Sequence, residues 1–140
     1  MIKSTLRLAS ATTMLASIGA AAVLAAGCSN MMSSSSSAPA PAMMSSGALV
    51  GPSGMTLYTF VRDVAGSGKS VCNGPCAALW PPLMAADKDQ PAGAYTIVMR
   101  DDGGRQWAYK GKPVYYYKPD TKAGDRTGDN FRDVWHIIKE

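Results

Sequence analysis

The stretch Gly54-Met-Thr-Leu-Tyr-Thr-Phe-Val-Arg-Asp63 occurs a second time, in altered form, as Gly111-Lys-Pro-Val-Tyr-Tyr-Tyr-Lys-Pro-Asp120. Both copies read Gly-x-x-aliphatic-Tyr-x-aromatic-x-x-Asp, and each is followed by a glycine-rich loop and a tryptophan. Repetition on this scale predicts one small unit made of two related halves. The motif residues with candidate roles are Tyr58, Phe60 and Asp63 in the first copy and Tyr115, Tyr117 and Asp120 in the second.

The spacing within the motif favours a structural role. Two aromatic residues two positions apart share one face of a strand and bury a large apolar area. An aspartate just after the strand can accept backbone N–H bonds from the following turn. The alternative is functional: the two halves bring Asp63 and Asp120 together beside tyrosine hydroxyls and form a polar binding cleft. Both interpretations are open from the sequence.

The N-terminal segment resembles a bacterial export signal. Lys3 and Arg7 precede an apolar run that ends before Cys28, which predicts a signal peptide over residues 1–27. A membrane-spanning helix is the alternative, but the small residues 25–27 favour cleavage. Ala26-Gly27-Cys28 is similar to a lipobox, in which the cysteine is acylated, although Ala25 occupies the place where leucine is usual. Plain cleavage near Ala26 is the alternative to lipidation.

Lipidation at Cys28 predicts a protein of the cell envelope, held to the periplasmic or outer-membrane face by several acyl chains. Without Lys3 and Arg7 the 14 basic residues become 12, against 10 acidic ones. The mature charge is then near +2, with no basic cluster interleaved with aromatic residues. Nucleic-acid binding is therefore not expected.

The remaining chain divides by composition into a tether and a folded domain. Residues 28–47 consist largely of Ser, Ala, Pro and Met and lack the apolar bulk that offsets ordering entropy, so we expect a flexible tether. One β domain should follow over residues 48–140, with repeats at about 48–90 and 104–140.

Side-chain alternation with period two predicts a mainly β fold, a small antiparallel domain. One short helix should follow the Cys-x-x-x-Cys loop, capped by Asn73-Gly74 and stopped by Pro81-Pro82. Tight turns are expected at 101–104 and 110–112. Strands are expected at 56–61, 95–99, 106–109, 114–117 and 134–138.

Cys72 and Cys76 remain as a pair once Cys28 is acylated. In an oxidising compartment such thiols form a disulfide. The alternative is a dithiol that binds copper or exchanges redox equivalents, with His136, the single histidine, as a further ligand. Nothing in the sequence places His136 near the two cysteines.

Several blocks together resemble the secreted-repeat lipoproteins, a family whose biochemical role is not established. They are the two Tyr-x-aromatic-x-x-Asp motifs, the block from Cys72 to Leu83, and the closing segments 124–129 and 134–136. The resemblance covers residues 48–140 and implies an envelope lipoprotein, but it implies no reaction.

Catalytic templates are poorly matched. There is no Cys-x-x-Cys-His haem motif, no zinc pair of Cys-x-x-Cys units and no phosphate-binding glycine loop before a helix. We therefore expect a lipid-anchored, non-enzymatic binding or interaction module without a cofactor. Its partner would be an envelope protein or a small ligand. A periplasmic copper-binding or thiol-redox protein is the competing prediction.

Overall fold

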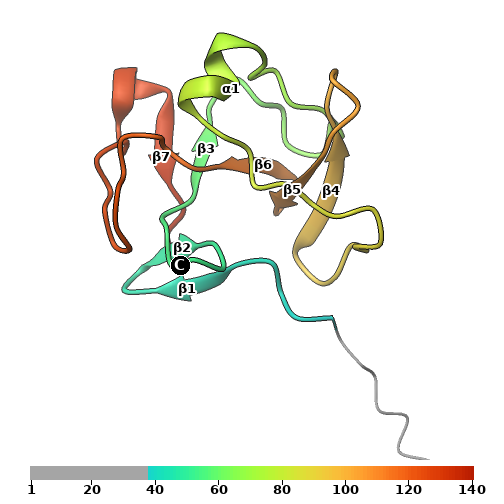
Figure 1. Ribbon diagram of the computed structural model, residues 1–140, viewed down its shortest axis with the longest axis horizontal. Helices are drawn as coiled ribbons and strands as arrows, with labels where there is room; N and C mark the ends of the chain where they lie inside the picture. The colour runs from blue at the N-terminus through green and yellow to red at the C-terminus, as the bar shows by residue number, and fades with distance from the viewer. Residues whose placement is uncertain (1–37) are drawn as a thin grey trace, which may run out of the picture. The chain divides into compact units, whose positions relative to one another are not determined.

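The computed structural model describes residues 38–140 (Figure 1). The predicted signal peptide, Cys28 and the first part of the predicted tether lie outside this range. Within it, no helix is long and apolar enough to cross a membrane. The elements in chain order are β1 (Met43–Ser45), β2 (Ala48–Val50), β3 (Tyr58–Phe60), α1 (Pro75–Leu79), β4 (Tyr95–Met99), β5 (Arg105–Tyr109), β6 (Lys112–Tyr115), the 3-10 turn η1 (Phe131–Asp133) and β7 (Trp135–Ile137).

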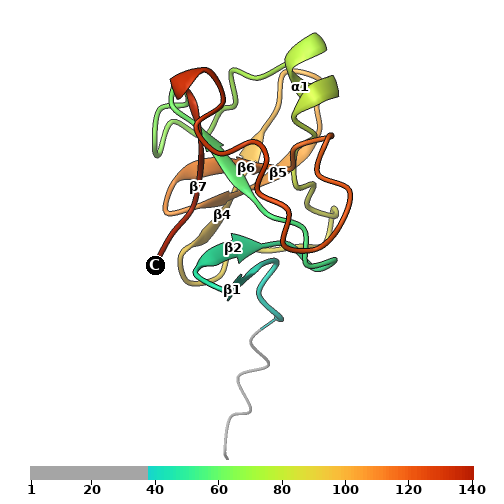
Figure 2. The same ribbon diagram turned by 90° about the vertical axis from the view of Figure 1, so that its left-hand side faces the viewer.

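The domain is built from two antiparallel sheets. Five strands pair in the order β4-β5-β6-β3-β7, and β1 pairs with β2 in a separate hairpin. Figures 1 and 2 show α1 and this hairpin at opposite ends of the domain. The predicted mainly β class with one short helix is confirmed, and so are the turns that join β4 to β5 and β5 to β6.

The two repeat motifs lie side by side at the centre of the larger sheet. Strand β3 carries the first motif and β6 the second, and they pair with Tyr58 directly opposite Tyr115. Equivalent residues of the two halves therefore face each other across an approximate twofold axis. The internal repeat of the sequence therefore corresponds to an internal twofold symmetry of the fold.

The end of each half completes the sheet of the other half. Strand β7, from the second half, pairs with β3 of the first, with Trp135 opposite Phe60. The equivalent segment of the first half crosses over in the same way, because Pro82 forms a bridge with Tyr115 and Met84 with Gln106. The halves are intertwined and share one interior.

The short helix α1 begins after Gly74, one of the two residues predicted to cap it. Gly74, with φ 54°, is its N-cap, and no side chain caps the helix. The expected cap by Asn73 is wrong because the Asn73 side chain instead contacts Arg100 and Asp101. Pro75 occupies the first turn and the helix ends before Pro81, as expected, since proline has no N–H to continue it.

Order begins earlier than the composition suggested. Strand β1 lies inside the segment predicted as tether, Ala42 is buried, and the Tyr95 hydroxyl donates to the Ala42 carbonyl at 2.9 Å. Ser46 and Gly47 both have positive φ, 49° and 77°, which is typical of a two-residue hairpin turn. The turn pairs β1 with β2 and so draws polar, low-complexity sequence into the fold.

The interior contains two apolar clusters. The first is largely aliphatic and lies between the β1–β2 hairpin, β5 and β6. The second is dominated by aromatic residues and includes the disulfide loop. The buried members of the first are Ala42, Leu49, Leu57, Leu83, Ala85, Trp107, Val114 and Ile138, and those of the second are Tyr58, Phe60, Cys72, Trp80, Tyr115 and Trp135.

Candidate functional site

The tyrosine and aspartate of the repeat motifs form two crossed hydrogen bonds. The Tyr58 hydroxyl donates to Asp120 Oδ2 at 2.6 Å, and the Tyr115 hydroxyl donates to Asp63 Oδ2 at 2.6 Å. All four side chains are buried, with Asp120 the most exposed at 6 %. Each motif therefore supplies a tyrosine to the aspartate of the other half.

Both aspartates also hold the loop that follows their own strand. Asp63 Oδ1 accepts the Val71 N–H at 2.8 Å, and Asp120 Oδ1 accepts the Thr127 N–H at 3.0 Å. Asp120 Oδ1 also accepts the Thr127 hydroxyl. The structure thus brings the motif residues together in pairs, but inside the protein, where each carboxylate is committed to protein donors.

The two tyrosines remain protonated far beyond ordinary conditions. Burial and, next, the hydrogen bond to Asp120 raise the pKa of Tyr58 well above its usual value near 10. Burial and the hydrogen bond to Asp63 do the same to the pKa of Tyr115. A phenolate beside a carboxylate in a dry interior is unfavourable. Both hydroxyls therefore serve as donors and not as bases.

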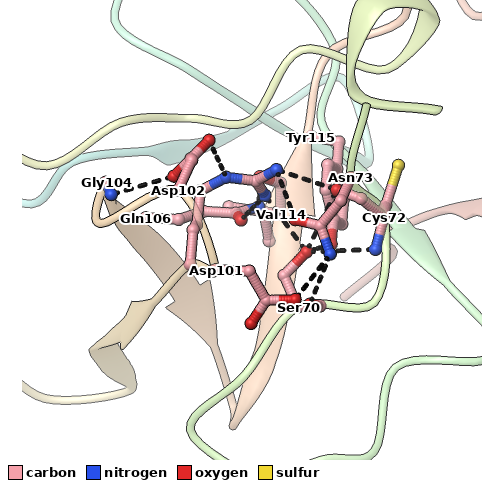
Figure 3. Close-up of polar contacts among 10 residues, drawn as sticks. Ser70, Cys72, Asn73, Asp101, Asp102, Gly104, Gln106, Val114 and Tyr115 are labelled. Carbon is pink, nitrogen blue, oxygen red and sulfur yellow. Dashed lines mark hydrogen bonds and ion pairs between the residues drawn. The ribbon is translucent and has the colours of Figure 1, made fainter. Parts of the chain in front are cut away.

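A buried arginine supports the pair in the first half. Arg100 is 4 % exposed at the end of β4, and its only ion pair among residues 38–140 is with Asp102 at 3.5 Å. Sequence analysis did not single it out, because one arginine after an alternating strand resembles an ordinary surface residue. Its guanidinium donates to Ser70 Oγ (3.1 Å), Gln106 Oε1 (2.7 Å), the Cys72 carbonyl (2.8 Å) and Asn73 Oδ1 (3.2 Å) (Figure 3).

Four aromatic rings form a stack across the approximate twofold axis. Centroids are 4.4 Å apart for Phe60 and Trp135, 3.9 Å for Trp135 and Trp80, and 4.2 Å for Trp80 and Tyr117. The two tryptophan planes differ by only 5°. Rings from the first and second halves alternate along the stack. We call Phe60, Trp135, Trp80 and Tyr117 the aromatic stack.

The crossed pairs brace this stack from the side. Tyr58 meets Trp80 edge-on at 5.3 Å, and Tyr115 meets Trp135 edge-on at 5.1 Å, a geometry that the ring quadrupoles favour. The loop that contains Gly128 lies against Trp80 only because residue 128 has no side chain: a Cβ there would lie 2.7 Å from the Trp80 ring. The motif tyrosines thus connect the buried carboxylates to the aromatic stack.

The cysteine pair lies beside the stack. Cys72 and Cys76 form a disulfide with Cα atoms 5.2 Å apart, which confirms the predicted pairing. Cys72 is buried within the aromatic cluster. His136 is placed on β7, with Nδ1 3.0 Å from Asn130 Oδ1. Within residues 38–140, no group of three His, Cys, Asp or Glu side chains is arranged to hold a metal. The copper alternative stays a prediction.

A pocket of about 300 Å³ opens where the stack reaches the surface. Four of its lining residues are aromatic, two are arginines and none is acidic. Arg62 and Arg132 are exposed, and neither forms an ion pair in the described part of the chain. The lining residues are Phe60, Arg62, Cys76, Leu79, Trp80, Phe131, Arg132, Val134 and Trp135. We call this the aromatic pocket.

One wall of the aromatic pocket has an unusual backbone. Asn130, Arg132 and Asp133 all have positive φ, at 60°, 51° and 56°, a region that residues with a Cβ rarely adopt. Such conformations persist only where the surroundings enforce them, and they concentrate at binding and catalytic sites. Sequence analysis missed this segment: Asn130 and Asp133 belong to the types that tolerate left-handed backbone, but Arg132 does not, and nothing in the sequence marked the three together.

Comparison with known proteins agrees with the internal duplication. No curated protein and no solved structure matches the chain. One protein-family model, described as a secreted repeat of unknown function, matches twice, over residues 45–84 and 96–139. The two matches together cover more than half of the chain and coincide with the halves that exchange their ends in the fold. The chain therefore belongs to this family of secreted repeats of unknown function.

Proposed function

We propose that this protein is a lipid-anchored envelope domain that binds a small ligand in the aromatic pocket. The observation that carries the proposal is the pocket itself. Large aromatic side chains, which normally close over one another, here line an opening of about 300 Å³ together with two arginines that form no ion pair within residues 38–140.

Three observations support a location in the cell envelope. The N-terminal segment has the charge and apolar pattern of an export signal, followed by Cys28. The family is one of secreted repeats. The Cys72–Cys76 disulfide suits an oxidising compartment. Acylation of Cys28 would place the domain at the membrane surface, on the periplasmic or outer-membrane face, at the end of a short tether.

The pocket has the properties of a small-molecule site. Such sites are concave, mainly apolar and start at about 300 Å³. Trp80 and Trp135 are almost fully buried, at 2 % and 3 % exposed, yet both line the pocket. A ligand would therefore touch only the small exposed part of these two rings and would lie mainly against the more exposed Leu79 and Phe131.

The repeat motif favours binding over chemistry. A catalytic carboxylate must reach a substrate, but Asp63 and Asp120 are buried and accept hydrogen bonds from tyrosines and backbone amides. The motif tyrosines are donors with raised pKa values. We assign these residues to construction of the pocket: they brace the stack, and the stack forms the floor.

The three tryptophans provide a direct test by NMR. With ¹⁵N-labelled chain, the indole signals of Trp80 and Trp135 report on the pocket, while Trp107, in the other core, serves as an internal reference. A library of small aromatic and aliphatic compounds should contain binders that shift the first two signals and leave the third unchanged. Leu79→Lys should abolish these shifts, because Leu79 lines the pocket.

Val64→Lys is the matched control, since Val64 is exposed and is not among the pocket residues. It should leave binding intact. A screen in which no compound moves Trp80 or Trp135, or in which both lysine variants act alike, would overturn the proposal. Counting free thiols on envelope-purified protein separates the copper alternative. A reduced pair that binds one Cu(I) tightly would favour that alternative.

A further inference from the structure

We infer that the aromatic pocket selects a planar aromatic carboxylate, a ligand with a flat ring system and one anionic group. This inference rests on the proposed function and names the ligand class of the same site. It follows from two features that meet at the pocket, an aromatic wall and a pair of uncompensated cations.

The aromatic part of the ligand is indicated by the wall. Phe60, Trp80, Phe131 and Trp135 line the pocket, and the first, second and fourth belong to the aromatic stack. Aromatic pairs gain attraction beyond their buried area when they meet offset or edge-on. Because Phe60, Trp80 and Trp135 are only 8 %, 2 % and 3 % exposed, a flat ligand ring would meet the small exposed part of these rings and the more exposed ring of Phe131. A volume of about 300 Å³ suits one or two fused rings.

The anionic part is indicated by charge. Arg62 follows β3 and Arg132 lies in η1, so the two guanidinium groups reach the pocket from different halves of the chain. No acidic residue lines the pocket, and neither arginine is ion-paired within residues 38–140. A guanidinium binds a carboxylate through two parallel N–H bonds. A cationic ligand would be repelled at the same place.

The backbone of η1 positions one of the two arginines, Arg132, in advance. The positive φ of Arg132 and Asp133 holds the turn in a shape that extended or helical backbone cannot provide. Arg132 Cζ lies 5.5 Å from the Phe131 ring centroid, so the cation and the aromatic wall are already side by side. Preorganised groups bind with less loss of conformational entropy.

Three commercial probes separate the components. Naphthalene-2-carboxylate has the ring and the charge, naphthalene-2-carboxamide has the ring alone, and cyclohexanecarboxylate has the charge without aromaticity. Titration of the full chain, followed by the indole signals and by calorimetry, should show the carboxylate binding about tenfold more tightly than the amide, as one charge-assisted interaction provides. Cyclohexanecarboxylate should bind more weakly than naphthalene-2-carboxylate.

Variants then assign the charge preference to the two arginines. The double variant Arg62→Gln/Arg132→Gln should remove the tenfold preference while keeping amide binding. Lys110→Gln/Lys112→Gln removes the same charge elsewhere, around a different surface pocket, and should leave the preference unchanged. Unshifted Trp107 signals verify that each variant is folded.

The outcomes distinguish the two proposals. Equal affinity for carboxylate and amide, with Trp80 and Trp135 signals still moving, overturns the ligand class and leaves the proposed function standing. An equal loss in the arginine and lysine double variants would show a general charge effect and also overturns the ligand class. If no probe moves the two signals and the library screen is also empty, both proposals fail.

Discussion

The two halves of the molecule use the same crossed tyrosine–aspartate bond but support it differently. In the first half, Ser70 lies 2.6 Å from the Tyr115 hydroxyl and accepts a hydrogen bond from buried Arg100. A chain of hydrogen bonds thus runs from a cation through Ser70 and Tyr115 to the carboxylate of Asp63. In the second half, the Tyr58 hydroxyl accepts the Gly128 N–H at 3.3 Å, and among residues 38–140 no cation joins the chain that leads to Asp120.

The comparison shows that the tyrosine–aspartate bonds of the shared interior are the same in both halves, whereas the groups that support them from the loops differ. Residues at the twofold axis contact both halves, so a change in one must fit two environments at once. The loops after each motif also bond to the other half, since Arg100 donates to Ser70 in the first loop and Gly128 in the second loop donates to the Tyr58 hydroxyl, but the two loops are held differently. The first loop has a disulfide and an arginine network, whereas the second relies on Thr127 and backbone amides.

The largest expected loss of stability comes from removing a tryptophan of the aromatic stack, to which both halves contribute. Trp80→Ala and Trp135→Ala should each lower the free energy of unfolding by about 3–5 kcal/mol, as removal of a buried tryptophan does. Urea denaturation measures both. Because the two rings stack on each other, the double variant should cost clearly less than the sum. Additive costs would contradict a common stack, and Val64→Ala, at an exposed site, serves as the neutral control.

A smaller effect should distinguish the two crossed bonds. Tyr115→Phe leaves the Asp63 carboxylate with one backbone donor, whereas Tyr58→Phe leaves Asp120 with the Thr127 amide and hydroxyl. Losing a hydrogen bond to a buried charged group costs roughly 1.5–3 kcal/mol. We expect Tyr115→Phe near the upper value and Tyr58→Phe near the lower one. Equal losses in thermal or urea unfolding would show that the Arg100 chain adds nothing.

The smallest effect appears in alkaline solution. The pKa values of Tyr58 and Tyr115 are raised by burial and by Asp120 and Asp63, so the unfolded chain releases these protons first, near pH 10. Their contribution to stability is complete below that pH and is lost as the pH rises toward the folded pKa values. Each tyrosine should contribute a slope of about 1.4 kcal/mol per pH unit.

Comparison of variants isolates this slope from other groups. Tyr95 and Tyr116 also have pKa values raised by burial, so the measurement is the difference between wild type and each of Tyr58→Phe and Tyr115→Phe. Unfolding free energies between pH 9 and 11.5 should fall less steeply in both variants. A slope identical to wild type would mean that the hydroxyl titrates alike in folded and unfolded chains.

Much of the fold was predictable because it depends on local pattern. Alternating side chains identified the central strands, and the prolines and glycines identified the ends of α1 and the hairpin turns. The crossed hydrogen bonds, in which each motif tyrosine donates to the aspartate of the other half, were not predictable. A Tyr-x-aromatic-x-x-Asp motif is equally compatible with a tyrosine bonded to its own aspartate. The choice depends on the register of β3 against β6, which places Tyr58 opposite Tyr115.

The candidate site was predictable only in part. Phe60 and Tyr117 were identified as motif residues, but the sequence does not show that Trp80 and Trp135 insert between them. Arg62, Arg132 and Arg100 have no distinguishing local pattern, since an arginine looks the same whether it is exposed or buried. Strand β1 was missed because composition suggested a tether, although Ser46-Gly47 is a recognisable turn.

Each half pairs its C-terminal segment with a strand of the other half, and this exchange affects how the chain folds during synthesis. Strand β7, which pairs with β3, is synthesised long after β3. The N-terminal half therefore lacks one neighbouring strand of its sheet until β7 has been synthesised, and long-range pairing of this kind is slow to form. We expect such a chain to complete its fold only after both halves are available, which suits a family of secreted proteins because export requires an unfolded chain.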